Sequence, residues 1–233
     1  MTKKFLPHII ELRQRLLKFF IVFAILLTPL IIFSNTLYTL IAQPLLKNLP
    51  EGGRLIATEV ITPFTAPIKL ALFSTLILLI PYLLYHLWAF VKPALYRHEK
   101  RTIFPVLFIS ILLFYIGMAF AHFIVCPLAL SFFMHTAPQG VTVMTDMNDY
   151  LDFMLVLYFA FGAAFQVPII TFLLCRFNIV SIETFKKQRP YIIVAAFIIG
   201  MLLTPPDVIS QILLAVPLLG LFEGGLLLAR LLK

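Results

Sequence analysis

Charged residues are confined to a few short segments of this 233-residue chain, and long uncharged runs separate those segments. No Asp, Glu, Lys or Arg occurs in residues 19–46, 70–91 or 102–145. A helix needs about 20 apolar residues to cross the hydrocarbon core of a bilayer. Runs of this length and composition therefore predict membrane-spanning helices, with charge retained only where the chain meets water.

These runs predict an all-α polytopic membrane protein with six transmembrane helices. The expected spans are residues 17–37, 70–90, 103–127, 153–175, 191–204 and 208–228. We expect a single transmembrane domain over residues 1–233, because no linker or low-complexity segment interrupts the chain. The first outer loop, from Pro44 to Pro67, is long enough to form a cap of short helices.

Basic residues predict the orientation of these helices. Four segments on one side of the membrane, which include both termini, hold fifteen of the 18 Lys and Arg residues. The other three, Lys47, Arg54 and Lys69, fall in the first loop of the opposite side. The loop before the fourth span carries acidic residues and no basic ones. Since Lys and Arg gather in cytoplasmic loops, we expect both termini in the cytoplasm.

Composition and net charge exclude other classes of protein. Hydrophobic residues make up 62% of the chain and the mean hydropathy is +1.05, which is more apolar surface than a soluble domain can bury. The formal charge of +8 does not indicate nucleic-acid binding, because the basic residues flank the apolar spans. Cys126 and Cys175 are expected to be small buried hydrophobes, without disulfide or metal spacing.

No pattern typical of catalysis or metal binding is present. The five histidines are scattered without ligand spacing, and the serines of the spans have no base nearby in the sequence. Hydroxyl groups in spans usually pack helices or bond to the backbone. We therefore expect no enzyme, no metal and no cofactor.

The fifth and sixth spans are short for a bilayer. Residues 191–204 make about 21 Å of helix, against a hydrocarbon core of ~30 Å. The sequence Thr204-Pro205-Pro206-Asp207 predicts a structural turn, because proline lacks an amide donor and Asp207 can cap the next helix. Either the bilayer thins locally around this hairpin, or both helices continue into their basic flanks.

Two polar residues stand out in or beside the apolar runs. Glu223 follows Asp207 by 16 residues, so we expect it near the cytoplasmic boundary, solvated or paired with Arg230. Gln166 is 13 residues into the fourth span and therefore lies well inside the membrane. A buried amide needs hydrogen-bond partners, so Gln166 either joins helices or takes a direct part in function.

Cytoplasmic carboxylates are few, which singles out Glu11 and Glu99. Glu11 lies in a segment whose apolar residues share one helical face, as in an amphipathic helix at the membrane interface. Glu99 stands in a strongly basic segment. It either neutralises its neighbours or receives a cationic ligand.

Five strings of residues stand out, in order over nearly the whole chain. They are His-x-x-Glu-Leu-Arg-x-Arg at 8–15, Pro-x-x-x-Tyr-x-x-Trp-x-Phe-x-x-Pro-x-Leu at 81–95, Phe-Tyr-x-Gly-x-x-Phe at 114–120, Lys-x-Arg-Pro-Tyr at 187–191 and Thr-Pro-Pro-Asp-x-x-Ser-Gln at 204–211. Together they resemble the TatC family of twin-arginine protein translocase core subunits. The resemblance implies a glove-shaped six-helix bundle in the bacterial cytoplasmic (inner) membrane. Such a bundle receives twin-arginine signal peptides at its cytoplasmic face and exports folded proteins with the proton-motive force. The implied partners are the single-span proteins TatA and TatB, in a larger complex that holds several copies of the chain.

The resemblance also implies roles for particular residues. The residues expected to bind the signal peptide are Glu11, Arg13, Phe90, Leu95 and Glu99. Those expected to bind partner helices are Met201, Thr204 and Gln211. The chain departs from the family pattern at Gln166, where many relatives carry Glu, and at His86, where Gln is common. Because an amide does not ionise, a mechanism that requires a proton on residue 166 does not fit this chain.

Two other classes of function remain open at this point. A secondary transporter for small solutes or ions would carry broken helices and charged pairs near the midplane, and only Gln166 and Glu223 come close to that. A pure membrane scaffold is the third reading. Reconstituted solute uptake, set against co-purification with a twin-arginine precursor, separates these alternatives.

Overall fold

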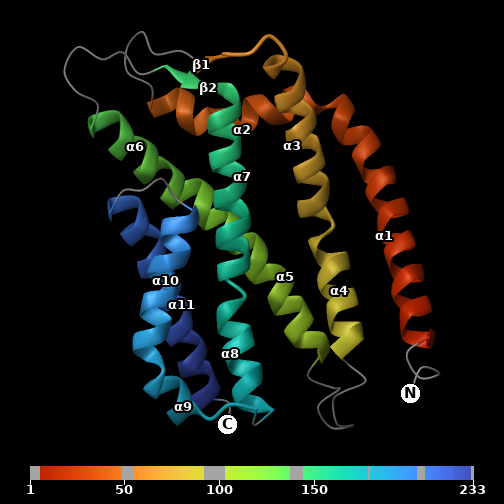
Figure 1. Cartoon of the computed structure of the whole chain (residues 1–233), viewed down its shortest axis with the longest axis vertical. Coiled ribbons are helices and arrows are strands. Elements are labelled where there is room, and N and C mark those ends of the chain that lie inside the picture. The colour runs from red at the N-terminus through yellow and green to blue at the C-terminus, as the bar shows by residue number, and fades with distance from the viewer. Residues whose placement is uncertain are drawn as a thin grey trace. The chain divides into compact units, whose positions relative to one another are not determined.

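The computed structural model describes residues 6–48, 55–91, 103–136, 144–177, 179–203 and 208–231, and these are almost entirely helical (Figure 1). By its internal contacts the chain divides into two compact units, residues 1–43 with 57–107, and residues 44–56 with 108–233. The predicted all-α fold is confirmed. The prediction of a single domain stays a prediction.

The first unit is built mainly from three helices and from the greater part of a fourth, and it also includes the first residues of α5 (Ile103–Phe120). The three helices are α1 (Leu6–Ile32), α3 (Thr62–Leu78) and α4 (Ile80–Val91), and the fourth is α2 (Ser34–Asn48). α1 packs on α3, and α3 and α4 together form one apolar run that bends by 44° at their junction. The buried face of α3 contains small residues such as Ala66 and Ala71, which let helices approach closely.

α1 differs in one respect from the sequence prediction. The amphipathic segment around Glu11 and the first span form one continuous helix, which ends at Ile32 instead of residue 37. No residue in the most apolar part of α1 is buried by the described part of the chain. Large side chains such as Phe20 and Ile25 are exposed along it, as expected for a helix that lies in lipid.

The second unit holds most of the remaining helices. They are the greater part of α5 (Ile103–Phe120), a π-helical turn η4 (Ala121–Val125), α6 (Cys126–Thr136), α7 (Met147–Ala164), α8 (Val167–Arg176), α9 (Ile182–Lys187), α10 (Arg189–Leu203) and α11 (Val208–Leu231). α7 supplies much of the core, including Leu151, Met154 and Phe161. α11 packs against both α8 and α10.

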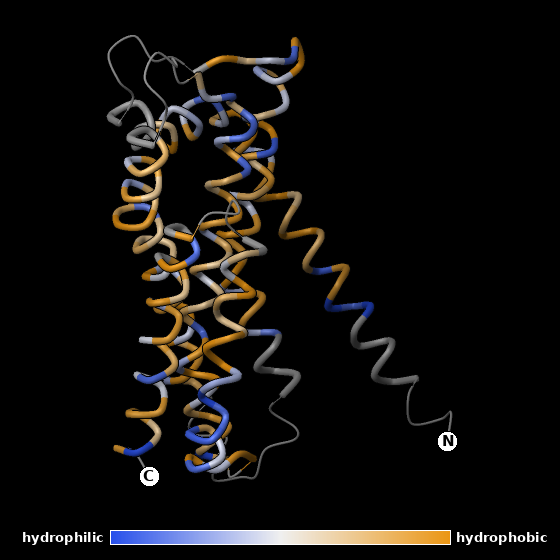
Figure 2. Tube along the Cα trace, turned by 60° about the vertical axis from the view of Figure 1, so that its left-hand side comes forward, coloured by the Kyte–Doolittle hydropathy of each residue, from blue (hydrophilic) through white to orange (hydrophobic). Residues whose placement is uncertain are grey.

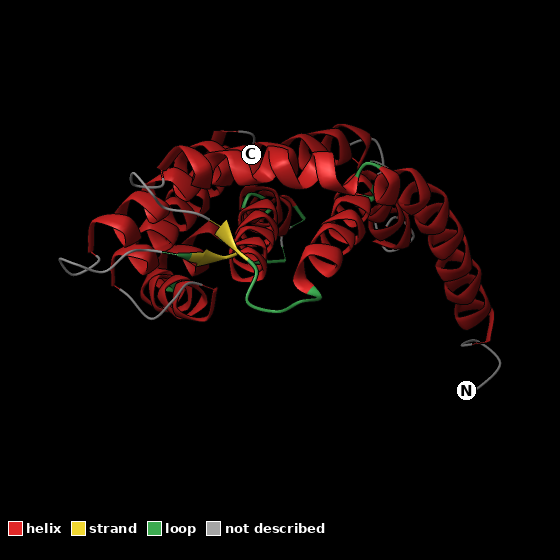
Figure 3. Ribbon diagram, turned by 90° about the horizontal axis from the view of Figure 1, so that it is seen from above, coloured by secondary structure: helices red, strands yellow, loops and turns green. Residues whose placement is uncertain are grey.

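A short parallel strand pair closes one end of this unit, where β1 (Leu55–Ile56) lies beside β2 (Thr145–Asp146) (Figure 3). Asp146 then begins α7, because its carboxylate accepts the amide of Asn148 at 2.7 Å and that of Asp149 at 3.3 Å. Such a cap satisfies helix amides that have no partner within the helix. The outer loop thus fixes where the fourth span starts.

Glycine allows three close helix approaches in this unit. A Cβ atom on Gly117 of α5 would lie 2.5 Å from the carbonyl oxygen of Phe161 in α7. One on Gly162 would lie 2.6 Å from the ring of Phe114, and one on Gly225 would lie 2.7 Å from Cα of Pro168. Without a Cβ atom, the α5–α7 and α8–α11 backbones can pack at these distances.

Apolar helices occupy all six predicted span positions. Among the described residues, four runs are long and apolar enough to cross a membrane, the bent α3–α4 pair makes a fifth, and α10 supplies a shorter apolar helix. α10 begins at Arg189 and α11 extends past Arg230, so both helices continue into their basic flanks. Figure 2 shows apolar residues along the helices and polar residues gathered towards their ends.

Candidate functional site

Side chains of α1 and α4 meet at the end of the first unit that is predicted to be cytoplasmic. The Nη1 atom of Arg15 lies 3.3 Å from Nδ1 of His86, and it donates to the His86 carbonyl oxygen at 3.4 Å. One turn further into the membrane, the rings of Phe19 and Tyr82 lie 6.4 Å apart. The Tyr82 and His86 rings are 4.3 Å apart in an edge arrangement. These contacts hold α1 beside α4.

The Arg15–His86 contact selects one form of the histidine. A guanidinium has donors and no acceptor, so Nδ1 of His86 can bond to it only as an acceptor. That requires a neutral imidazole with its proton on Nε2. The sequence showed His86 only as a departure from the family pattern and did not single out Arg15. The available signal was a matching pair of four-residue spacings, Arg15 to Phe19 and Tyr82 to His86.

The structure places part of the expected signal-peptide set on these two helices. Glu11 lies one turn before Arg15 in α1, and Arg13 is exposed on the same helix. Phe90 lies one turn beyond His86 in α4. Leu95 and Glu99 lie outside the described residues. The two helices that carry the described members therefore contact each other through Arg15 and His86 and through Phe19 and Tyr82.

Gln166 sits at a break within the fourth span. α7 ends at Ala164 and α8 begins at Val167, followed by Pro168, which has no amide to donate back along the helix. The Nε2 atom of Gln166 donates to the Ser110 carbonyl oxygen of α5 at 2.9 Å. The amide of Gln166 therefore links two spans at the place where the fourth one breaks.

Gln211 and Met201 lie on the α10–α11 hairpin, and Figure 1 shows these two helices side by side. Nε2 of Gln211 donates to the Phe197 carbonyl oxygen at 2.8 Å. A Cβ atom on Gly200 would lie 3.1 Å from Cγ of Gln211, so a glycine leaves room for this side chain. Met201 is 55% exposed. Thr204, Pro205, Pro206 and Asp207 lie outside the described residues.

Glu223 is paired, and the partner corrects the sequence expectation. Its Oε2 atom lies 2.6 Å from Nη2 of Arg189, at the start of α10, and no ion pair in the described part of the chain joins Glu223 to Arg230. The two partners are 34 residues apart. The sequence left Glu223 either solvated or paired with Arg230, and the packing of α10 against α11 supplies Arg189 as its partner.

Polar groups also meet inside the second unit at positions that sequence reasoning left unassigned. His122, in the π-helical turn η4, is hydrogen-bonded through Nδ1 to the Tyr158 hydroxyl at 2.6 Å. The Cys126 thiol lies 3.1 Å from the sulfur of Met154. Cys126 and Cys175 are both buried, as predicted, and form no disulfide within the described residues. Among the same residues no cluster of three or more His, Cys, Asp or Glu could hold a metal ion.

Comparison with known proteins points to one family. The family model described as "Sec-independent protein translocase protein (TatC)" matches residues 7–217. A TatC protein of Haemophilus influenzae is 53% identical over 98% of this chain and 90% of its own length. A TatC protein of Escherichia coli strain K12 is 51% identical over 98% of this chain and 89% of its own length.

A solved structure matches the fold as well. A crystal structure of TatC, described as the twin arginine translocase receptor, superposes with a TM-score of 0.84 at 39% sequence identity. The match covers 96% of this chain and 98% of the solved one. Sequence and backbone comparisons therefore agree over nearly the whole chain.

Proposed function

The chain belongs to the TatC family, and from that premise we propose that it binds twin-arginine signal peptides at its cytoplasmic face through Glu99 and Glu11. It is a core subunit of the twin-arginine protein translocase, a multi-pass protein of the bacterial cytoplasmic membrane and not an enzyme. This membership decides against the secondary transporter and the pure scaffold. The remaining question is which residues meet the signal and the partners.

The chemistry of the signal favours carboxylates. Two adjacent arginines present planar, permanently charged forks, which suit carboxylates in bidentate geometry. Each charge-assisted hydrogen bond contributes about 1.5–3 kcal/mol, or roughly 10- to 150-fold in affinity. Lysine cannot form the fork, so a carboxylate pair would separate Arg-Arg from Lys-Lys signals.

The contact between α1 and α4 supports this proposal. Glu11 precedes Arg15 by one turn, and α4 leads towards the segment that contains Glu99. Because Arg15 bonds to His86, the helix that carries Glu11 is held beside the helix that leads to Glu99. Phe90 and Leu95 would offer an apolar wall to neighbouring residues of the signal. Arg13, exposed on α1, would repel cations that lack a carboxylate partner.

Signal-peptide binding to purified, folded protein tests the proposal. Glu99→Ala, Glu11→Ala and the double variant are compared for binding of an Arg-Arg signal peptide and its Lys-Lys form. Glu183→Ala is the matched control, since Glu183 is an exposed cytoplasmic carboxylate on α9 with no proposed role. We expect Glu99→Ala to lose Arg-Arg binding, Glu11→Ala to lose part of it and Glu183→Ala to keep it. Unchanged binding in all three Glu99 and Glu11 variants would end the proposal.

A second part of the proposal concerns the partners. We propose that TatA and TatB, as single-span proteins, dock their membrane helices near Met201, Thr204 and Gln211. The exposed Met201 side chain offers apolar contact. The Gln211 amide already donates to Phe197, so its role would be to keep α10 and α11 together beneath the partner helix. An interhelical hydrogen bond of this kind contributes roughly 0.6–2 kcal/mol in a membrane.

Disulfide crosslinking tests the docking position. Met201→Cys and Gln211→Cys are each combined with single cysteines placed in turn along the outer half of a TatB span. Ala215→Cys is the control, because Ala215 is 0% exposed. The native Cys126 and Cys175 are buried and provide a silent background. We expect crosslinks from Met201→Cys and none from Ala215→Cys. Uniform absence of crosslinks in a folded protein would count against docking at this position.

A further inference from the structure

The Lys-x-Arg-Pro-Tyr string has no part in the proposed function, and it forms a distinct basic turn in the structure. Residues 186–191, called the basic turn from here on, comprise the end of α9, Gln188 and the start of α10, and they contain Lys186, Lys187 and Arg189 within four positions. Lys186 and Lys187 are exposed and make no ion pair in the described part of the chain. Glu183, one turn before Lys187, is not bonded to it there. Two cations of the turn are therefore available to an external anion.

The basic turn is held on a fixed frame. α9 begins at a capped residue, because Ser181 Oγ accepts the Thr184 amide at 3.1 Å. The Phe185 ring packs against Phe222 of α11, with ring centroids 5.9 Å apart. At the other end of the turn, Arg189 is bonded to Glu223 of α11. The two lysines thus project from a segment anchored on both sides, and a ligand would lose little free energy by ordering it.

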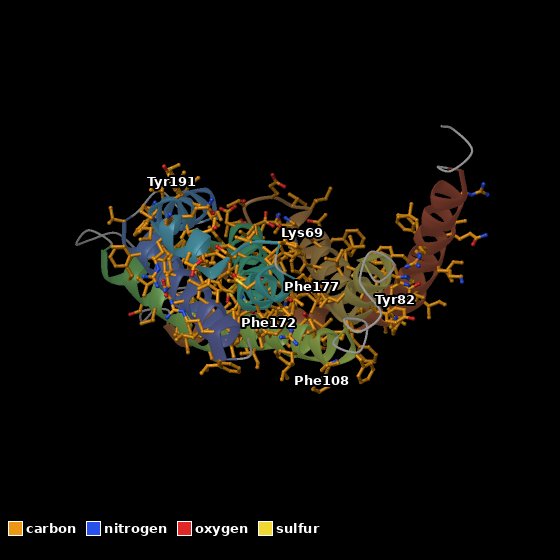
Figure 4. The ribbon with its side chains drawn as sticks, turned by 90° about the horizontal axis from the view of Figure 1, so that it is seen from below. Lys69, Tyr82, Phe108, Phe172, Phe177 and Tyr191 are labelled. Atoms are coloured by element: carbon orange, nitrogen blue, oxygen red, sulfur yellow. The ribbon has the colours of Figure 1, made fainter. Side chains whose placement is uncertain are left out.

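The surroundings are apolar on one side and basic on the other. Tyr191 is 76% exposed and Val194 is 56% exposed, so α10 presents apolar surface directly after the cations. Figure 4 shows Tyr191 at the outer edge of the helices, and Figure 2 shows a hydrophilic end that gives way to apolar helix. Tyrosine is enriched where a helix passes from head groups into hydrocarbon. A ligand that fits would have an anionic head and an apolar tail.

Nearby helix ends add positive charge. α8 and α11 end at the same side of this unit as α9 (Figure 1), and they carry Arg176 and Arg230 there. Among the described residues of this end, five Lys and Arg residues stand against two carboxylates, Glu183 and Glu223. Basic sites between helices on the cytoplasmic side attract anionic lipid head groups, by about 1 kcal/mol for each Lys or Arg.

We propose that the basic turn binds the phosphate head group of an anionic phospholipid, with Lys186 and Lys187 as direct contacts. The outer part of Arg189, whose side chain remains 43% exposed beside Glu223, lies next to the same head group. The acyl chains run along the exposed face of α10 past Tyr191. Because this site lies in the second unit, it does not depend on Glu99 or Glu11.

Native mass spectrometry of the detergent-purified chain, titrated with cardiolipin and with phosphatidylcholine, tests the proposal. We expect cardiolipin to bind and phosphatidylcholine not to compete with it. Lys187→Gln should weaken cardiolipin binding about 5-fold, and Lys186→Gln with Lys187→Gln about 30-fold, which corresponds to about 1 kcal/mol per cation. Lys18→Gln removes one exposed cation from α1 and should leave the affinity unchanged.

Two further measurements establish whether the positive charge of the lysines and the apolar face of α10 both contribute to lipid binding. The charge-retaining pair Lys186→Arg and Lys187→Arg should bind cardiolipin as the parent chain does. Excess inorganic phosphate should not displace the lipid, because the apolar contact along α10 is missing for a free ion. Unchanged affinity in the double Gln variant would overturn the proposal. So would equal losses in the Arg and Gln pairs, or full displacement by inorganic phosphate.

Discussion

Arg189 and Glu223 join the first turn of α10 to the second half of α11, with 2.6 Å between Nη2 and Oε2. At the other end of the hairpin, Gln211 donates to the Phe197 carbonyl oxygen at 2.8 Å. Two hydrogen-bonded contacts, at different positions along the helices, therefore join the short fifth span to the sixth. A partner helix that docks on this hairpin would meet α10 and α11 as one body.

We predict measurable coupling between Arg189 and Glu223. Their side chains are 43% and 45% exposed, so solvent screens the pair and the expected coupling free energy is about 0.2–1 kcal/mol. A double-mutant cycle of Arg189→Gln and Glu223→Gln, read by unfolding of the detergent-purified protein, measures it. Glu183→Gln, which removes a carboxylate without an ion pair in the described residues, should change little. Fully additive losses in the cycle would show that the contact contributes nothing.

Gly117→Ala is expected to destabilise the second unit. The new methyl group would lie 2.5 Å from the Phe161 carbonyl oxygen and 2.9 Å from the Phe165 ring, so α5 and α7 must move apart. Overpacking of this kind costs about 1–3 kcal/mol. Gly220→Ala is the matched control, because nothing lies within 4 Å of its added Cβ and alanine favours helix by up to about 1 kcal/mol. Thermal unfolding in one detergent should give a lower melting temperature than the parent chain for Gly117→Ala and a higher one for Gly220→Ala. Equal melting temperatures for the two variants would contradict the packing argument.

Gln166→Leu should remove the link between the broken fourth span and α5, because Leu cannot donate to the Ser110 carbonyl. Melting temperature and transport per folded molecule are measured together. If the amide serves only to join helices, Leu lowers the melting temperature and leaves transport per folded molecule unchanged. If the amide has a direct role in transport, transport per folded molecule falls as well. Transport per folded molecule therefore distinguishes a joining role of Gln166 from a direct one.

Gln166→Glu gives a pH-dependent version of the same test. A carboxyl group can donate to a carbonyl oxygen only when it is protonated. The variant should therefore approach the parent chain's stability at low pH and lose stability relative to it as pH rises and the carboxyl ionises. Melting curves of parent and variant across a pH series measure this difference. A gap that stays constant with pH would mean that the side chain of residue 166 does not act as a donor.

The orientation of the chain predicts a labelling pattern in intact cells. A cysteine at Lys187 should be shielded from an impermeant thiol reagent, as should cysteines at Lys4, Arg97 and Lys233. One at the exposed Asp149 should react. The reason is the gathering of Lys and Arg on one side of the membrane. Labelling of Arg97→Cys from outside would exclude the six-span topology.

The sequence by itself determined where the membrane spans lie and which way they face. Residues 19–46, 70–91 and 102–145 contain no charged side chain, because placing a charge in hydrocarbon costs free energy whichever helices lie nearby. That penalty is a property of each residue and the solvent, so it can be read without any tertiary contact. The same holds for Asp146 and Ser181, whose capping depends on neighbours two or three residues away.

Only the tertiary structure decided which polar groups meet. Arg15 and His86 are 71 residues apart, Ser110 and Gln166 are 56 apart, and Arg189 and Glu223 are 34 apart. The sequence left Glu223 either solvated or paired with Arg230, and packing against α10 supplied Arg189 as its partner. Contacts of this range depend on how helices rotate and approach one another. That is set by packing details such as the missing Cβ atoms of Gly117 and Gly225 and not by periodicity within any one helix.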